Sequence, residues 1–184
     1  MPGFYKPGEY DLAGFCVGIV EEKEVIDGRK IRPGDIIFGL PSSGLHSNGF
    51  SLVRKIFSQK ELRSLGKELL KPTKIYVKDV LSVKSIVRGI AHITGGGFID
   101  NIPRILPRGC QALIHKGSWR VPRIFHLVQK KGKIEEQEMF HTFNMGIGMV
   151  LIVSPAKRKS LLTRLPQARP IGEVLSGRRQ VKII

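Results

Sequence analysis

The sequence has little of what marks a membrane protein, a secreted disulfide-bonded domain or a zinc protein. None of its apolar runs approaches the roughly 18 residues of a membrane-spanning helix, and its first ten residues contain no apolar segment typical of a secretory signal. Its two cysteines, Cys16 and Cys110, show no CxxC spacing and have no clustered histidines beside them. We therefore expect a cytoplasmic protein without membrane contact or a metal site, in which both cysteines are buried free thiols.

Acidic residues are also scarce, because 15 Asp and Glu stand against 31 Lys and Arg and leave a net charge of +16. Such an excess favours anionic partners, either phosphorylated metabolites or nucleic acid. The basic residues are scattered, however, and their densest groups are the short runs at 130–133, 157–159 and 178–179. Runs of this kind are common at helix ends and in terminal loops. Nucleic acid is therefore the less favoured partner.

Several catalytic motifs are missing. The sequence contains no GxSxG elbow, no Walker sequence, no GxGxxG after a strand and no paired carboxylates near its glycine-rich loops. What it has instead is 21 glycines set between apolar runs, in a chain of 184 residues that is long enough for one globular domain. No repeat or linker divides it. The pattern offers backbone groups suited to a phosphate rather than an obvious nucleophile.

Apolar spacing and turn signals predict a layered domain of the α+β or mixed α/β class, since strands and helices interleave without a regular βαβ period. Strands are expected at 10–20, 25–26, 36–40, 111–115, 145–154 and 181–184, with 145–154 central to the sheet. Helices are expected at 50–57, 76–89, 98–106, 122–132, 135–140 and 155–165, the third interrupted by Pro103.

The first glycine-rich loop follows the predicted strand at 36–40 and reads Ser42-Ser43-Gly44-Leu45-His46-Ser47-Asn48-Gly49. Its glycines allow close backbone approach, and its hydroxyls next to a helix start supply donors for an anion. His46 suits a phosphate contact or proton transfer near neutral pH. An ordinary strand-to-helix turn capped by Asn48 explains the same residues equally well.

Two further loops have the same character. The stretch from His92 through Thr94 to Gly95-Gly96-Gly97 presents consecutive backbone N–H groups that form a nest for an anion, which favours ligand contact over a purely structural turn. His92 itself also fits a hydrogen-bonded core residue. In Asn144-Met145-Gly146-Ile147-Gly148, the glycines fit close strand packing as well as they fit a substrate, and Asn144 is both donor and acceptor.

These three loops, in this order, resemble the carboxy-terminal domain of aminoimidazole ribonucleotide (AIR) synthetase, the phosphoribosylformylglycinamidine cyclo-ligase family. The resemblance rests on blocks spread over nearly the whole chain: Tyr10-Asp11-Leu12-Ala13-Gly14-Phe15, residues 42–55, Pro72-Thr73-Lys74-Ile75-Tyr76, residues 91–97, Asn101-Ile102-Pro103-Arg104, Glu138-Met139 and residues 143–149. It implies a three-layer α/β/α domain with partial ferredoxin-like topology.

The resemblance also implies a reaction. ATP phosphorylates the amide oxygen of formylglycinamidine ribonucleotide, a nitrogen attacks to close the imidazole ring, and phosphate leaves, as a step of purine biosynthesis. Preorganised donors and Mg²⁺ stabilise the phosphoryl charge in such chemistry. ATP and Mg²⁺ are thus the implied cofactors, with most of their ligands in the amino-terminal half of the family.

Carried over by position, the loop at 43–49 and the loop at 92–97 should both face the cleft between the two domains of the family. The resemblance then makes His46 and His92 the candidate catalytic residues. The candidate substrate or phosphate contacts are Ser43, Gly44, Ser47, Asn48, Gly49, Thr94, Gly95, Gly96, Gly97 and Asn144.

The start of the chain, Met1-Pro2-Gly3-Phe4-Tyr5, resembles an internal stretch of the full-length family. Residues 1–9 are accordingly expected to be an interdomain lead-in and 10–184 the carboxy-terminal domain. The amino-terminal domain, which is the expected partner and forms the family's homodimer, is then absent, and the chain is expected not to turn over alone. An excised piece, an alternative start, half of a split enzyme and a decayed gene product all fit.

Two other functions stay open at this stage. A non-catalytic basic module that binds anions or nucleic acid would use the same charge and would lose affinity steeply with added salt. A related enzyme of the selenophosphate or thiamine-phosphate kinase type would share the fold, although the blocks around His46 and His92 resemble AIR synthetase more closely.

Overall fold

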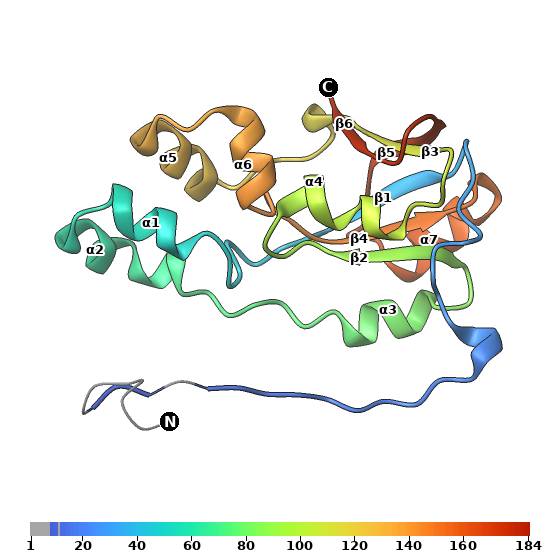
Figure 1. The fold of residues 1–184 in the computed structure, drawn as a ribbon, viewed down its shortest axis with the longest axis horizontal. Coiled ribbons are helices and arrows are strands. Elements are labelled where there is room, and N and C mark those ends of the chain that lie inside the picture. Colours follow the sequence, from blue (N-terminus) through green and yellow to red (C-terminus); the bar gives the residue numbers. More distant parts are fainter. Residues whose placement is uncertain (1–7, 11) are drawn as a thin grey trace.

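The computed structural model describes residues 8–10 and 12–184, so most of the expected lead-in at 1–9 lies outside the described residues. Its centre is a six-stranded sheet in the order β2-β4-β1-β5-β3-β6 (Figure 1). Neighbouring strands are antiparallel, apart from the parallel pair of β3 and β6. The strands are β1 (Ile36–Pro41), β2 (Val87–His92), β3 (Cys110–Ile114), β4 (Ile147–Val153), β5 (Arg169–Ser176) and β6 (Val181–Ile183).

Both faces of this sheet are covered by helices, which makes the predicted three-layer α/β/α domain. The central strand β4 is buried along its whole length. Its Val150 and Ile152 join the larger apolar cluster on one face, whereas Leu151 and Val153 join the smaller cluster on the other. Because successive strand residues point to opposite faces, a strand covered on both sides is apolar throughout. The mixed α/β class and the central place of 145–154 are confirmed.

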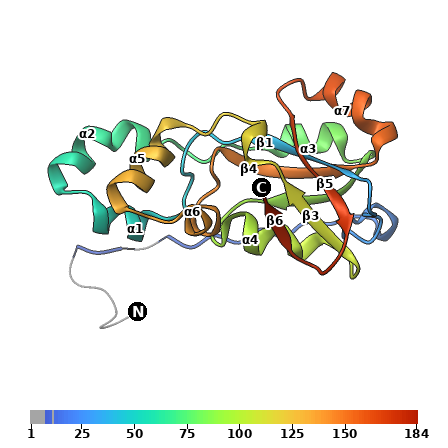
Figure 2. The same cartoon turned by 90° about the horizontal axis from the view of Figure 1, so that it is seen from above.

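The helices lie in two layers. Helices α4, α5 and α6 lie on the side of the larger cluster, α3 and α7 lie on the other side, and α1, α2 and α5 extend past one end of the sheet (Figures 1 and 2). The α-helices are α1 (Phe50–Ile56), α2 (Gln59–Leu69), α3 (Val77–Val83), α4 (Gly97–Asn101), α5 (Arg123–Gly132), α6 (Glu136–Thr142) and α7 (Arg158–Arg164). Single 3₁₀ turns form η1 (Glu22–Glu24), η2 (Pro103–Ile105), η3 (Lys116–Ser118) and η4 (Pro155–Lys157). None of the described helices is long and apolar enough to cross a membrane.

The predicted helix at 76–89 is wrong over its second half. Helix α3 ends at Val83, and Val87 opens strand β2. The helical spacing misled because Tyr76, Val83 and Val87 all bury their side chains in the same cluster, although the last of them reaches it from a strand. Gly89 is not a helix cap but a strand glycine packed closely against Ile31.

The predicted strands at 10–20 and 25–26 do not form in the part of the chain that the structure describes. Residues 12–21 have no regular structure, and this arm runs outside the three layers (Figure 1). Phe15 and Ile19 are 96% and 101% exposed. Cys16 lies on the same arm and is exposed, so the expectation of two buried thiols is wrong for Cys16 and right for Cys110. An extended segment becomes a strand only where a second strand receives its hydrogen bonds.

Candidate functional site

The loop after β1 is held in place by a buried asparagine from the far end of the sequence. Asn144 is completely buried; its Nδ2 donates to the Gly44 carbonyl at 2.8 Å, and its Oδ1 accepts from Ser42 Oγ at 3.0 Å and from the Gly146 amide at 2.9 Å. Every polar atom of this amide is thus engaged within the protein. The structure places Asn144 behind the first loop, where it fixes the backbone of that loop.

His46 lies at the centre of the same loop and has an unusual backbone conformation, with φ at +58°. Its Nε2 accepts hydrogen bonds from the backbone N–H groups of Ser43 at 3.2 Å and Lys74 at 3.4 Å. A ring nitrogen that accepts cannot carry the proton, so the neutral ring is protonated at Nδ1. Burial, followed by the charges of His92 and Lys74, lowers the pKa of His46 to about 4. His46 is therefore neutral at pH 7.

The Nδ1 atom of His46 is buried and has no hydrogen-bond partner among the described residues. An unsatisfied buried donor costs about 1–3 kcal/mol. Such a cost is tolerated where an acceptor arrives from outside the chain. The Nδ1–H group of His46 is thus a donor at the centre of the first loop whose orientation is fixed by the two hydrogen bonds to Nε2.

Three aromatic rings meet beside this loop. His46, Tyr76 and His92 lie with their ring centroids 6.0–6.3 Å apart, and the Tyr76 hydroxyl donates to the Pro41 carbonyl at 2.9 Å. They fit together because Gly148 on β4 has no side chain; a Cβ there would overlap the Tyr76 hydroxyl and the His46 ring. His92 is exposed, and partial burial of its ring lowers its pKa.

The triple-glycine loop has an asparagine clamp of its own. Asn101 is buried, and its Nδ2 donates to the carbonyls of Gly95 at 3.1 Å and Gly97 at 2.8 Å. Gly96 adopts φ of +89° as the residue before α4, and Gly97 packs so closely on α6 that a Cβ would overlap the Phe140 carbonyl. The backbone N–H groups of Gly95 and Gly96 donate to no acceptor in the described part of the chain. They form the kind of nest that binds anions.

The two loops converge. A Cβ built on Gly95 would lie 3.7 Å from Oδ1 of Asn48, and the ring centroids of His46 and His92 are 6.3 Å apart. Sequence reasoning expected these loops to share a cleft, and the structure brings them side by side. Ser47 and Asn48 line a hollow together with Gly49, Ser51, Lys55, Glu138 and Thr142. Hydroxyl, amide, ammonium and carboxylate groups thus surround the junction of the loops.

A third segment joins them that sequence reasoning did not assign to the site. The Ser43 hydroxyl donates to the Pro72 carbonyl at 2.6 Å, and the hydroxyls of Ser47 and Thr73 lie 3.2 Å apart. Lys74 bonds His46 through its backbone and lies with its ammonium 5.0 Å from the Tyr76 ring centroid. The run 72–76 was available as a signal, because it belongs to the blocks on which the family resemblance rests. Asn101, which holds the triple-glycine loop, likewise belongs to one of these blocks, residues 101–104.

Metal ligands are a separate question. Among residues 8–10 and 12–184, no three His, Cys, Asp or Glu side chains are arranged to hold a metal ion. The side chains around the converging loops are mainly hydroxyls, amides, imidazoles and ammonium groups, with two carboxylates, from Glu138 at the hollow and from Asp100 beside Gly96. Both carboxylates face His141, at 3.6 Å and 3.3 Å, so these groups do not present the set of free oxygen ligands that Mg²⁺ prefers.

Comparison with known proteins gives consistent findings. A family model described as "AIR synthase related protein, C-terminal domain" matches residues 32–184. The phosphoribosylformylglycinamidine cyclo-ligase of Thermoanaerobacter pseudethanolicus is 56% identical over 193 residues, covering 96% of this chain and 57% of the relative. The chloroplastic/mitochondrial cyclo-ligase of Vigna unguiculata is 54% identical over 192 residues, covering 96% of this chain and 50% of the relative. The chain thus spans about half the length of these relatives.

Solved structures confirm the fold. Thiamine-monophosphate kinase from Stenotrophomonas maltophilia has a TM-score of 0.63 at 13% identity, covering 89% of this chain and 54% of that chain. The hydrogenase maturation protein HypE of E. coli has a TM-score of 0.60 at 18% identity, covering 85% of this chain and 48% of that chain. AaThiL, solved with AMPPCP and TMP, has a TM-score of 0.55 at 15% identity, covering 85% of this chain and 49% of that chain.

Proposed function

The chain belongs to the AIR synthase related family, as a C-terminal domain of that family, and from this premise we propose that it is the substrate-side domain of a phosphoribosylformylglycinamidine cyclo-ligase. Its ligand is formylglycinamidine ribonucleotide, held between the loops at 43–49 and 92–97. The observation that carries the proposal is the convergence of these two loops, with Gly95 facing Asn48 and His46 beside His92.

The converging loops suit a sugar phosphate. The N–H groups of Gly95 and Gly96 that have no acceptor in the described chain point to an anion nest. The exposed Ser47 and the half-buried Asn48 add side-chain donors and acceptors. Lys55 supplies positive charge from the same hollow. We assign the phosphate or the amidine of the substrate to these groups, with Ser43 and Thr94 at the edges of the site.

The two histidines take different parts in this proposal. His46 is neutral and uses Nε2 to hold two backbone N–H groups, so we assign it as a positioning residue whose Nδ1–H donates to a ligand oxygen. His92 is exposed and also has a lowered pKa, which leaves a neutral ring able to accept a proton. We therefore assign the proton transfer of ring closure to His92. Gly44, Gly49, Gly97 and Asn144 shape the loops.

ATP is the phosphoryl donor in this proposal, and the structural relative solved with an ATP analogue supports that choice. The residues that hold ATP and Mg²⁺ are assigned to the part of the relatives that this chain does not span. No residue of this chain is given to Mg²⁺.

The exposed arm is the proposed contact with that other part. Phe15, Val17 and Ile19 alternate along it and are almost fully exposed. Soluble proteins rarely leave contiguous apolar surface of this kind uncovered. The family model starts at residue 32, whereas the aligned relatives include the arm and extend over roughly as much sequence again. An extended segment of alternating apolar residues docks well by adding a strand to a sheet.

Complementation tests the function. The chain is mixed with the separately expressed amino-terminal half of the Thermoanaerobacter pseudethanolicus relative, substrate and ATP, and ADP release is measured. The proposal predicts turnover that requires both pieces. ADP release that never exceeds that of the amino-terminal half alone would show that the proposed function is wrong.

A further inference from the structure

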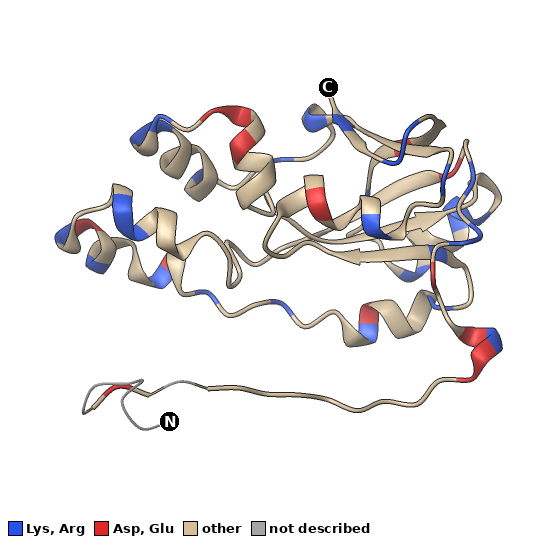
Figure 3. Ribbon diagram, viewed as in Figure 1, with Lys and Arg blue, Asp and Glu red and all other residues tan. Residues whose placement is uncertain are grey.

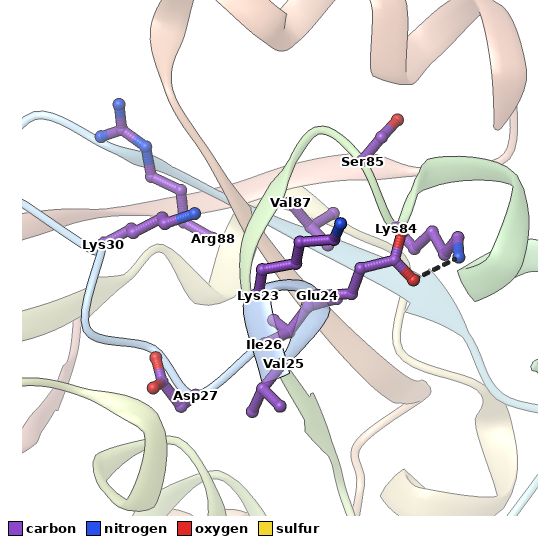
Figure 4. A pocket seen from close by; sticks show the side chains of 10 residues that line it. All are labelled: Lys23, Glu24, Val25, Ile26, Asp27, Lys30, Lys84, Ser85, Val87 and Arg88. Carbon is purple, nitrogen blue, oxygen red and sulfur yellow. Dashed lines mark hydrogen bonds and ion pairs between the residues drawn. The ribbon is translucent and has the colours of Figure 1, made fainter. Parts of the chain in front are cut away.

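A second cleft lies at the end of the sheet opposite to the converging loops. It is formed by the chain around η1 and by the turn that leads from α3 into β2 (Figure 4). Arg88, near the start of strand β2, lines this cleft, whereas His92 at the end of the same strand lies beside the converging loops. Four residues along a strand span about 13 Å at roughly 3.3 Å per residue. The cleft is therefore separate from the proposed substrate site.

Positive charge dominates this cleft. Its lining includes four basic side chains, from Lys23, Lys30, Lys84 and Arg88. The two acids that also line it are already engaged: Glu24 pairs with Lys84 at 3.3 Å, and Asp27 pairs with Arg29. Lys23 and Lys30 have no carboxylate partner in the described part of the chain. Figure 4 shows the Lys30 side chain beside Arg88 and the Lys23 side chain extending toward the side of Glu24 and Ser85.

Arg88 is held in position for an anion. Its NH1 donates at 2.7 Å to Oδ1 of Asp35, a carboxylate that is 2% exposed on its side chain and also accepts the Arg32 amide. A guanidinium has five N–H donors, and this contact uses one of them. Because the side chain is already ordered, a ligand that binds the remaining donors loses less conformational entropy.

The cleft is small. Its volume of about 190 Å³ is below the roughly 300–1,000 Å³ of pockets that take drug-sized ligands. Val25 and Val87 give it an apolar wall, and Ser85 contributes a hydroxyl. Lys84 at its rim stays paired with Glu24, so the contacts to a ligand fall to Lys23, Lys30 and Arg88.

We propose that this cleft is a binding site for a small free polyanion of the phosphate class, such as a pyrophosphate or a short phosphate ester. Part of the high net charge thereby serves a ligand other than the substrate. The basic residues elsewhere are spread over helices and loops on both sides of the sheet (Figure 3). In this cleft, Lys23 and Lys30 share the lining with the ordered guanidinium of Arg88.

The test is calorimetric titration of the full chain with inorganic pyrophosphate at physiological ionic strength. The variant Lys23→Ala/Lys30→Ala removes the two unpaired ammonium groups and leaves the Arg88–Asp35 pair in place. Its matched control, Lys60→Ala/Lys67→Ala, removes two exposed lysines from α2. We expect the cleft variant to bind at least tenfold more weakly and the control to stay within about twofold of the parent.

Amide chemical shifts locate the site. On pyrophosphate addition, shifts confined to residues 23–30 and 84–88 support the proposal, and both variants should unfold at the parental temperature. Equal weakening in the two variants, no measurable binding at millimolar pyrophosphate, or shifts at 47–49 and 94–97 would overturn it. So would tighter binding of a DNA duplex that the cleft variant abolishes, since this would make the cleft part of a nucleic-acid surface.

Discussion

At the scale of single residues, the environment of His46 gives the stability of the domain a pH dependence. The pKa of this ring is lowered to about 4 in the fold against roughly 6.5 for an unfolded histidine. The unfolded chain therefore takes up a proton between these values and the folded chain does not. Stability is highest above pH 6.5 and falls as the pH drops toward 4, by up to about 3 kcal/mol from this residue.

Urea unfolding of the parent and of His46→Gln from pH 7 to pH 4 checks this. A glutamine oxygen can take the place of Nε2 as acceptor but does not titrate. The variant should lose less stability over the range. A decline of the same size in both proteins would contradict the assignment of the acid sensitivity to His46.

Gly148 offers a second residue-scale prediction, because its missing side chain makes room for Tyr76 and His46. Gly148→Ala should destabilise the domain by about 1–3 kcal/mol, as overpacking does. Gly66→Ala is the matched control, since a Cβ at this helical position meets nothing and alanine favours a helix by about 0.5–1 kcal/mol. Thermal unfolding should move the two variants in opposite directions; equal midpoints would refute the packing argument.

Residue types that carry local chemistry could be predicted from the sequence, whereas residues that act through tertiary contacts could not. His46, Asn48 and the glycine run stood out because glycines, amides and imidazoles cluster there. Gly148 lay in the third glycine loop and Tyr76 in the block 72–76, but their packing against His46 could not be predicted, because it arises only when a loop and a strand come together. Asn144 was identified as a ligand candidate, yet its burial makes it a support of the loop.

At the scale of elements, the two glycine loops are each fixed by one buried asparagine. Asn101→Ala would remove the donors that the carbonyls of Gly95 and Gly97 now use. Leaving such acceptors unpaired costs about 1–3 kcal/mol, so we expect a loss of that size in denaturant unfolding. Amide exchange should rise at 94–97 more than in β4. Unchanged exchange in the loop would contradict the role of Asn101 as its clamp.

Most elements were predictable at this scale, but helix α2 and strand β5 were not predicted, and the start of strand β2 was assigned to a helix. Helix α2 was missed although its start carries a capping box, with Ser58 and Glu61 exchanging hydrogen bonds. Strand β5 was missed because Pro170 lies near its start and cannot donate to the sheet. It pairs with β1 nonetheless, with a register shift between Ile37 and Phe38.

At the scale of the whole molecule, the exposed arm should matter for assembly with the other half but not for the stability of the domain. Deletion of residues 2–20 removes no side chain of the described core, so the melting temperature should change by no more than about 2 °C. The deletion should nevertheless abolish ADP release in the complementation assay. Phe15→Ser/Ile19→Ser is a milder variant that should weaken assembly in the same direction. Full complementation by the deleted chain would show that the arm is not the contact.

The central claim is that the loops at 43–49 and 92–97 hold one ligand between them, and Gly95→Ala tests it most directly. The new methyl group would lie near Asn48 at an ordinary contact distance and would not strain the fold, yet it would occupy the space between the loops. In calorimetric titration with formylglycinamidine ribonucleotide, we expect Gly95→Ala to bind at least tenfold more weakly than the parent, while Gly66→Ala binds as the parent does. Parental affinity in Gly95→Ala, with the fold intact, would contradict the account.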